Sequence, residues 1–117
     1  MNTIMNPVNE IIVPAPVEFI ELVRGNDQRL VQMLDPFVRE HSTVLDMGRV
    51  RRIDAAGIAA LIATYGNART AGNTFRVCNV TPHVAEILRL VGLDNILVTR
   101  EEVRARHPNC CLEYPAA

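Results

Sequence analysis

The sequence contains no lysine, and all 12 of its basic residues are arginines. It therefore lacks the lysine that binds phosphate in a phosphate-binding loop and the lysine that forms a Schiff base with a carbonyl substrate. It also has no GxxxxGK[ST] motif and no GxGxxG motif. These absences disfavour the common kinds of nucleotide chemistry.

Serine is almost as scarce, since Ser42 is the only one in the chain. It lies outside any nucleophile-elbow motif, and the three histidines are scattered. No Ser/His/Asp or Cys/His triad is therefore suggested. An enzyme that uses Asp54 or Asp46 in a pocket would lack a second catalytic group, so we expect a protein without catalytic activity.

The chain also lacks a large charge excess and a long hydrophobic run. Its formal net charge is -1, which gives no reason to expect nucleic acid or an anionic membrane as the main partner. No apolar run approaches the ~20 residues that cross a bilayer, and the first residues lack the regions of a signal peptide. Three cysteines, two of them adjacent, do not form the pattern of a disulfide-bonded secreted domain. We expect a reduced, soluble, cytoplasmic protein that does not insert into a membrane.

At 117 residues and 49% hydrophobic composition, the chain suits one compact domain, because single domains cluster at roughly 100 to 150 residues. Residues 1–10 are polar and are expected to form a flexible N-terminal arm. The domain is expected over residues 11–107, and residues 108–117 form a C-terminal tail.

A buried strand, a turn and a helix are predicted in line between Thr43 and Gly72. The apolar run Val44–Met47 is short enough for a buried strand, and Gly72 ends the helix. The turn Asp54–Gly57 should present the N-terminus of the helix to solvent, which makes it the first candidate for a functional site. Four apolar residues of the helix share the i, i+3, i+4, i+7 spacing of one face and are expected in the core: Ile58, Leu61, Ile62 and Tyr65.

The remaining segments alternate between strand and helix patterns. Strands are expected over residues 11–13, 17–23, 74–80 and 95–98. Helices are expected after Asn26 or Asp27, from Pro82 to the stop at Gly92, and over residues 99–106. Pro36 either kinks the first helix or starts a second short turn capped by Asp35, and we predict the second. This alternation implies strand-helix-strand crossovers and an α/β fold with a mostly parallel sheet.

The order of these elements and their motifs resemble the STAS domain, a family named for sulphate transporters and anti-sigma factor antagonists. The resemblance to the antagonist group is closest from Val44 to Val98. It implies a mixed, mostly parallel sheet of four to five strands with helices packed on it, and a protein-binding module without a cofactor. Four linked segments carry it: the strand Val44–Asp46, the loop Ile53–Gly57, the strand Phe75–Asn79, and the segment from Thr81-Pro82 to Val91-Gly92-Leu93.

The resemblance also implies a role for the turn. In antagonists that are controlled by phosphorylation, the turn reads Asp-Ser-Ser/Thr-Gly, and its second hydroxyl residue receives a phosphate from the anti-sigma kinase. Here these positions are Ala55 and Ala56, which have no hydroxyl, and the family pattern gives Ser42 no role. We predict that the turn is not phosphorylated and that the protein acts constitutively or is controlled by expression or by its partner's state.

Two interpretations stay open for most residues near the turn. Asp54 either orients the turn for a partner or caps the helix. Arg51 and Arg52, with Arg49, are either a solvated loop or contacts for acidic groups of a partner. Ala59, Ala60 and Ala63 either accept a partner's helix or are simply good helix formers, and Gly57 is expected to allow a close backbone approach. The candidate partner-binding residues are Arg51, Arg52, Asp54, Ala55, Ala56, Gly57 and Ile58.

The partner implied by the resemblance is an anti-sigma factor or a serine kinase of the histidine-kinase-like ATPase class. Alternatively, the chain is an accessory STAS subunit that docks the ATPase of a bacterial ABC system for lipids, in which the turn needs no acceptor serine. A homodimer stays open. We expect no metal site, because the spacing of His107, Cys110 and Cys111 is not that of a zinc finger or ribbon.

Overall fold

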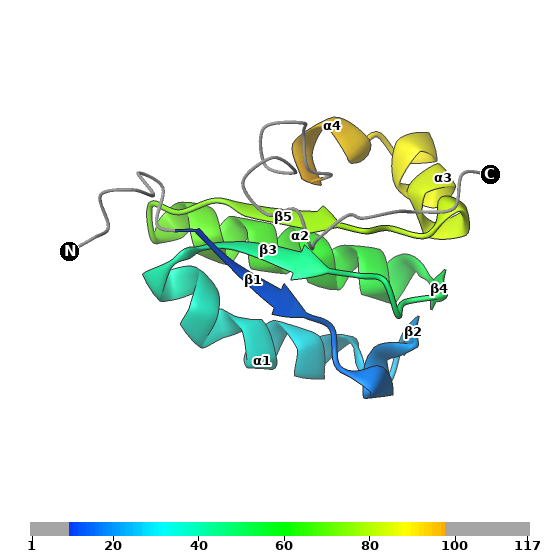
Figure 1. Cartoon of the computed structure of the whole chain (residues 1–117), viewed down its shortest axis with the longest axis horizontal. Coiled ribbons are helices and arrows are strands. Elements are labelled where there is room, and N and C mark those ends of the chain that lie inside the picture. The colour runs from blue at the N-terminus through cyan, green and yellow to red at the C-terminus, as the bar shows by residue number, and fades with distance from the viewer. Residues whose placement is uncertain (1–9, 98–117) are drawn as a thin grey trace.

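Five short strands and four α-helices make up the part of the chain that the computed structural model describes, residues 10–97 (Figure 1). Strands and helices alternate along most of it. In order, the elements are β1 (Glu10–Pro14), the 3-10 turn η2 (Val17–Phe19), β2 (Glu21–Leu22), α1 (Asp27–Glu40), β3 (Ser42–Asp46), β4 (Arg52–Ile53), α2 (Ala55–Thr70), β5 (Phe75–Cys78), α3 (Pro82–Leu90) and α4 (Asp94–Leu97).

Several expectations lie outside the described residues. They concern the helix over 99–106, the tail, and His107, Cys110 and Cys111 as potential metal ligands. The expected arm lies outside them too, except for Glu10, which already belongs to β1.

All strand pairs within residues 10–97 are parallel, as the α/β pattern predicted. β1, β3 and β5 form one sheet with β3 in the middle, in a register that places Val44 opposite both Ile12 and Arg76. β2 and β4 form a separate ladder, in which Leu22 lies opposite Ile53. The expected strand number is therefore confirmed, and the five strands are divided between two parallel ladders.

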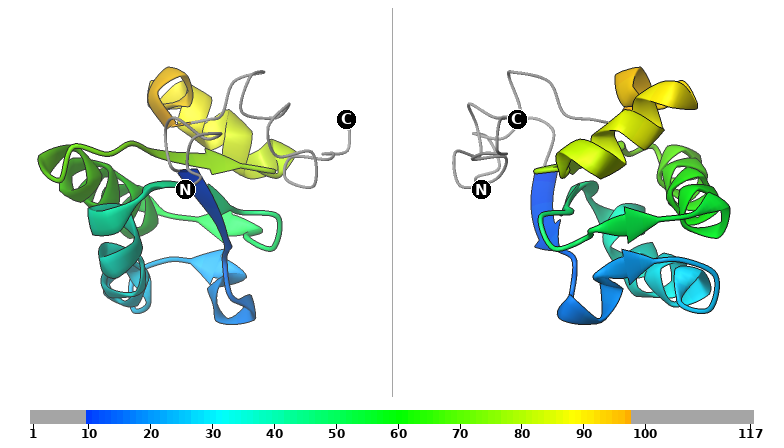
Figure 2. Two further views of the ribbon diagram at one scale, coloured as in Figure 1. Left: turned by 60° about the vertical axis from the view of Figure 1, so that its left-hand side comes forward. Right: turned by 90° about the vertical axis from the view of Figure 1, so that its right-hand side faces the viewer.

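Helices α1 and α2 pack against each other on one side of the three-stranded sheet (Figures 1 and 2). Successive strand side chains point to opposite faces, so Leu45 of β3 and Val77 of β5 reach the core under these helices. α3 and α4 lie on the β5 side of the sheet and add Leu88 and Leu97 to the same core. The sheet and the helices on both sides thus share one core.

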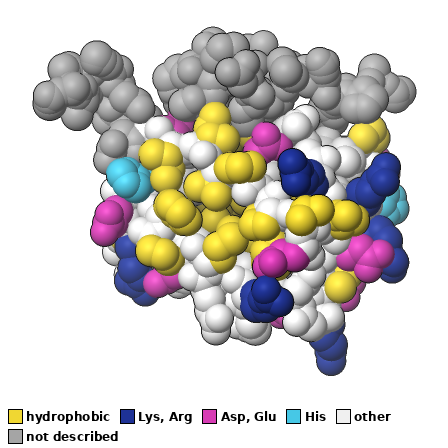
Figure 3. Space-filling view, turned by 60° about the horizontal axis from the view of Figure 1, so that its bottom comes forward, with side chains coloured by type: hydrophobic (Ala, Val, Ile, Leu, Met, Phe, Trp, Pro, Cys, Tyr) yellow, Lys and Arg dark blue, Asp and Glu magenta, His cyan; other side chains and the backbone are white. Residues whose placement is uncertain are grey.

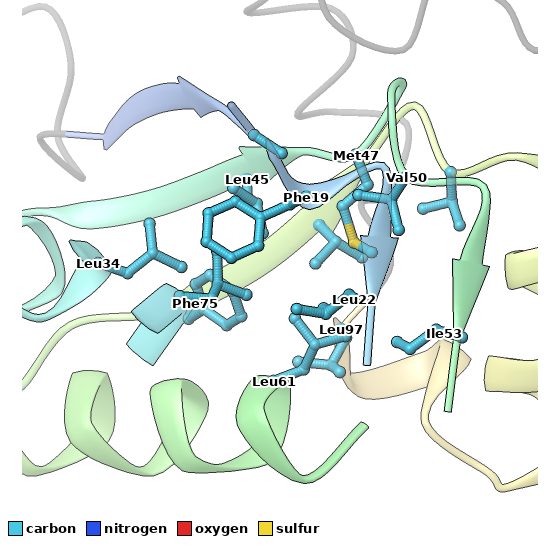
Figure 4. Close-up of a cluster of buried hydrophobic side chains, with 14 of the residues drawn as sticks. Phe19, Leu22, Leu34, Leu45, Met47, Val50, Ile53, Leu61, Phe75 and Leu97 are labelled. Carbon is cyan, nitrogen blue, oxygen red and sulfur yellow. The ribbon is translucent and has the colours of Figure 1, made fainter. Parts of the chain in front are cut away.

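The strand prediction over residues 17–23 is wrong in its first half, where the 3-10 turn η2 forms instead. The amide of Phe19 donates to the carbonyl of Pro16 at 2.9 Å, which closes the turn. Phe19 is nearly fully buried and lies near Leu45 and Met47 (Figure 4). Burial of such a side chain stabilises the fold by roughly 1.5–3 kcal/mol relative to exposure, so a turn that buries Phe19 is favoured over a continuous strand.

The expected core face of the central helix is wrong at Ile62, whose side chain is 48% exposed. Leu61 is buried as expected, and Ile58 and Tyr65 are half-buried against the core. The helix packs against α1 as well as the sheet, and small residues allow two helices to approach closely. The buried residues of α2 are accordingly Gly57, Ala60, Leu61, Thr64 and Ala68.

Two further expectations are wrong. Pro36 lies inside a continuous α1, and it neither ends the helix nor starts a second turn. Proline has no amide hydrogen, so the carbonyl of Gln32 loses its helical hydrogen-bond donor at Pro36. Both residues are exposed. Residues 94–97 form α4 instead of a strand, because the amides of Ile96 and Leu97 donate to the carbonyl of Leu93.

The ends of α3 confirm the sequence signals that predicted them. Thr81 caps the helix with its hydroxyl, which accepts from the amide of Val84 at 3.4 Å, and Pro82 is the first helical residue. Gly92 follows the helix with a φ of 80°, a conformation that favours glycine. Val91 follows the last helical residue and is 51% exposed.

A smaller apolar cluster lies on the other face of the sheet, where Val44 and Cys78 are buried and Ile12 packs against them. Cys78 is disulfide-bonded. This differs from the reduced cysteines that the sequence pattern predicted. No helix within residues 10–97 has the length and hydropathy needed to span a bilayer.

The two leucines near the end of α3 test the placement of the core. Leu88 is fully buried, whereas Leu90 is 69% exposed. We expect Leu88→Ala to lower the free energy of unfolding by roughly 2–5 kcal/mol, because it leaves a cavity. The matched change Leu90→Ala should alter it by about 0.5 kcal/mol or less. Urea unfolding followed by circular dichroism measures both, and equal losses would contradict this orientation of α3.

Candidate functional site

The turn before α2 is held in place by the β2–β4 ladder. The amide of Arg51 donates to the carbonyl of Ile20 at 2.7 Å, and the amide of Asp54 donates to the carbonyl of Leu22 at 3.3 Å. The side chain of Ile53 is buried in the core. Residues 51 and 54 are therefore both hydrogen-bonded to the segment of β2, and the turn begins directly after this support.

Asp54 caps α2, which confirms the cap interpretation. Its Oδ1 atom accepts a hydrogen bond from the amide of Gly57 at 3.0 Å, and its Oδ2 atom accepts one from the amide of Arg24 at 3.1 Å. These two bonds hold the pKa of Asp54 below its ordinary value of 3.8, the bond from Gly57 having the larger effect. The carboxylate is thus charged at neutral pH, and it joins the loop after β2 to the start of α2, which begins at Ala55.

Gly57 lies where α2 comes closest to β2, as its expected role required. A Cβ atom at this position would collide with the carbonyl oxygen of Leu22 and lie 2.8 Å from Cγ1 of Ile53. Backbone atoms cannot move aside as a flexible side chain can. Only glycine therefore permits this approach of the helix to the ladder.

The two positions that match the hydroxyl residues of the family turn lie at the N-terminus of α2. Ala55 is exposed, Ala56 is half-exposed, and Ile58 follows them with a half-buried side chain. The only serine, Ser42, is buried at the start of β3, where its hydroxyl oxygen accepts from the amide of Thr74 at 3.1 Å. No hydroxyl side chain is therefore present at the start of α2.

The arginines before the turn differ in their contacts. Arg52 forms an ion pair with Glu21 at 3.0 Å, directly across the β2–β4 ladder. Arg49 and Arg51 are exposed and take part in none of the ion pairs found among residues 10–97. An exposed ion pair contributes about 0–1 kcal/mol, so Arg52 can exchange Glu21 for an acidic group of a partner at little cost.

The outward face of α2 carries no charge over most of its length. Its first charged residue is Arg69, 14 residues after the helix begins. Ala60 packs inside the molecule, so only Ala59 and Ala63 of the three alanines considered for a partner are exposed. The exposed uncharged residues of α2 before Arg69 are Ala55, Ala59, Ile62, Ala63 and Gly66.

Apolar exposure is not confined to α2. The side of the molecule on which α1 lies shows hydrophobic side chains in the middle of its surface and charged side chains around them (Figure 3). Phe37 of α1, and Val17 and Ile20 before β2, are exposed. An experiment on the α2 surface therefore needs a control on α1.

The two carboxylates considered for catalysis both bind groups of this chain. The hydrogen bonds of the Asp54 carboxylate to the amides of Gly57 and Arg24 are described above. Oδ1 of Asp46 accepts from the amide of Gly48 at 2.9 Å and from the side-chain amide of Asn79 at 3.1 Å. Within residues 10–97, no group of three or more histidine, cysteine, aspartate or glutamate side chains is arranged to hold a metal ion.

Three contacts of the turn could not be read from the sequence. They are the bond from Arg24 to Asp54, the pair between Arg52 and Glu21, and the approach of Gly57 to Leu22. Each joins residues 30 to 35 positions apart at a ladder of two-residue strands, and strands this short have no periodic pattern. The glycine within the helix pattern was the one local signal of a close backbone approach.

The sequence matches the family model described as "Mlab, STAS domain" over residues 21–99. This range runs from β2 through the last described helix, and it includes the turn and all of α2. The sequence matches no curated protein.

Solved structures with the same arrangement of elements include several STAS proteins. An anti-sigma-factor antagonist (STAS) domain protein from Planctomyces limnophilus has a TM-score of 0.67 at 16% identity, covering 81% of this chain and 87% of that one. A putative anti-sigma factor antagonist from Thermotoga maritima has a TM-score of 0.68 at 18% identity, covering 86% of each chain. The anti-sigma factor antagonist SpoIIAA in its unphosphorylated form has a TM-score of 0.64 at 12% identity, covering 87% and 90%. These likenesses show a shared fold.

The pKa of Asp54 leads to a prediction on stability against pH. Asp54→Asn keeps an oxygen for the amide of Gly57 but removes the titration. Because the folded-state pKa lies below the unfolded value of 3.8, the carboxylate stabilises the fold above about pH 3.8, and this contribution is lost as the pH falls through the folded-state pKa. We expect the stability difference between wild type and Asp54→Asn to shrink between about pH 6 and about pH 3.

Urea unfolding midpoints at several pH values measure this difference. Glu86→Gln, which removes one acidic charge from the surface of α3, serves as the control for a general effect of charge. A difference between wild type and Asp54→Asn that stays constant over this range would show that the cap does not depend on the carboxylate charge.

Proposed function

Because the chain belongs to the STAS-domain family, we propose that it is a non-catalytic protein-binding module of the anti-sigma factor antagonist type. It binds an anti-sigma factor or a serine kinase of the histidine-kinase-like ATPase class. The binding surface consists of the turn Asp54–Gly57, the arginines before it, and the outward face of α2. The observation that carries the proposal is the rigidly supported turn, followed by a helix face without charge.

The composition of that face supports binding of a protein. Ala55, Ala59 and Ala63 leave only methyl groups above the helix backbone, so another helix can approach closely. Ile62 adds a larger apolar side chain between them. Removing such apolar surface from water on binding is favourable. This face has no charged side chain whose burial would need a compensating partner group.

The absence of a hydroxyl at Ala55 and Ala56 supports binding without a phosphorylation switch at the turn. A phosphate at a helix N-terminus would add a charge of about -1.5 to -2 beside the free backbone amides. Alanine cannot receive it. The module then binds constitutively, and it is controlled by its expression or by the state of its partner.

A second candidate is an accessory subunit that docks the ATPase of a bacterial ABC system for lipid transport. Two observations favour it. The matching family model is described by the name Mlab and not as an antagonist, and this role needs no acceptor hydroxyl at the turn. The same surface of α2 would contact the ATPase, so the two candidates differ in the partner and not in the site.

Affinity capture from the native lysate tests the surface and identifies the partner together. Ala59→Arg places a long charged side chain on the exposed face of α2 without touching the core. We expect wild type to retain a partner that Ala59→Arg loses. Gln32→Arg, on an exposed position of α1, introduces the same charge elsewhere and should retain it.

The captured protein distinguishes the candidates. An anti-sigma factor or a serine kinase supports the antagonist proposal, and an ABC ATPase replaces it with the transport proposal. Retention of the partner by Ala59→Arg, with loss in Phe37→Arg, would move the binding surface to α1.

The arginines give a second prediction for the purified complex. Arg51→Ala combined with Arg52→Ala should weaken binding of the captured partner by more than tenfold, or about 1.4 kcal/mol, if their guanidiniums meet acidic groups. Calorimetry measures the change, and Arg89→Ala, which removes the exposed pair with Glu86 on α3, is the control. An unchanged affinity assigns these arginines to the solvated loop.

A further inference from the structure

A groove runs along the second half of α2, where this helix faces α4. Its apolar part has a volume of about 140 Å³. Ile62 on α2 is 48% exposed and Ile96 on α4 is 44% exposed, so the groove is open to solvent. The residues that line this part are Ile62, Tyr65, Leu93, Ile96 and Leu97.

A larger basic hollow beside β5, with a volume of about 450 Å³, lies next to the groove. Tyr65 and Ile96 line both parts, so the two adjoin each other. Among the residues that line the hollow, the charged ones are Arg69 and Arg76, and Asn73 adds a neutral polar side chain. The apolar groove thus adjoins a hollow whose charged lining residues, within residues 10–97, are both arginines.

These two arginines, like Arg49 and Arg51, take part in none of the ion pairs found among residues 10–97. Arg29, Arg39, Arg52 and Arg89 each form an ion pair with a carboxylate. The guanidinium of Arg69 donates instead to the hydroxyl of Tyr65 at 3.2 Å and lies 5.8 Å from the centre of its ring.

We propose that this groove binds an acidic amphipathic segment of the partner protein. Apolar side chains of the segment pack between Ile62 and Ile96, and carboxylates that follow them pair with Arg69 and Arg76. The inference rests on the proposed function and extends its surface. From Ala55 to Arg69 the helix is about 21 Å long at a rise of 1.5 Å per residue, so one partner can contact the turn at one end and the basic hollow at the other.

The charge pattern selects this partner among those that an apolar groove alone would admit. A segment with basic residues at the same place would meet two arginines without a compensating carboxylate. Complementary charges fix the direction in which a segment lies and exclude wrong partners. Guanidinium groups also bind carboxylates in a bidentate geometry that ammonium groups cannot provide.

Two synthetic peptides test the groove on the full-length chain. Both have the same apolar residues at helical spacing; one ends in three glutamates and the other in three lysines. Peptide titrations are followed by amide chemical shifts of the labelled protein. We expect the glutamate peptide to bind at least tenfold more tightly than the lysine peptide, with shifts concentrated on the second half of α2 and on α4.

Charge reversal makes the test independent of folding defects. Arg69→Glu combined with Arg76→Glu should reverse the preference, so that the lysine peptide binds more tightly, which a misfolded variant would not do. Ile62→Asp should weaken both peptides, and Arg89→Glu on α3 should change neither. Equal binding of the two peptides, no binding of either, or shifts confined to α1 would overturn the proposal.

The outcome separates the groove from the proposed function. If Ala59→Arg loses the natural partner but the two peptides bind equally well, the proposal that α2 binds the partner stands. The proposal that the groove binds an acidic segment is then wrong. Reversed preference in the arginine variant together with an unaffected Ala59→Arg complex would support the groove and place the partner away from the turn.

Discussion

The close approach of α2 to β2 at Gly57 is the constraint on which the candidate site depends. A side chain at this position would collide with the carbonyl of Leu22, so the helix can begin here only because residue 57 has none. The amide of the same glycine donates to the carboxylate of Asp54, which also binds the loop after β2 through Arg24. One residue thus sets both the distance of the helix from the ladder and the geometry of its cap.

The two faces of α2 use small residues for different purposes. On the inner face, Ala60, Thr64 and Ala68 let the helix lie close to α1 and the sheet. The hydroxyl of Thr64 donates to the carbonyl of Ala60 at 2.9 Å, so burial of this polar group leaves no donor unsatisfied. On the outer face, Ala59 and Ala63 are exposed, and no packing among residues 10–97 requires them to be uncharged. Charged residues there would improve solubility without disturbing the core. Under the proposed function, the outer face stays uncharged because it forms the interface with the partner.

Much of the fold could be predicted from local signals. The apolar run at Val44, the cap at Thr81 with Pro82, and the stop at Gly92 each specify a boundary by their own chemistry, and all three agree with the structure. The spacing of α2 predicted a helix, but not which side faces inward. The positions of the large apolar residues predicted that Ile62 faces the core, whereas contact with α1 places small residues on the inner face.

The remaining differences share a physical cause. Strands of two residues such as β2 and β4 are defined by their partner across the ladder, and no periodicity reveals a partner about 30 residues away. Pro36 is tolerated inside α1 because the hydrogen bond it removes lies on an exposed part of the helix. The candidate turn was found because its residues are consecutive, whereas the groove between α2 and α4 joins residues that only the folded chain brings together.

The turn has a single charge state over the physiological pH range. The pKa of Asp54 is held below 3.8 by the amides of Gly57 and Arg24, and the two positions after it have no group that titrates or accepts a phosphate. The carboxylate already supplies the negative charge that a helix N-terminus favours. A surface with a fixed cap and no modifiable hydroxyl presents the same charges to every partner. Under the proposed function, a change in binding must therefore come from the partner or from the amount of this protein, and not from the turn.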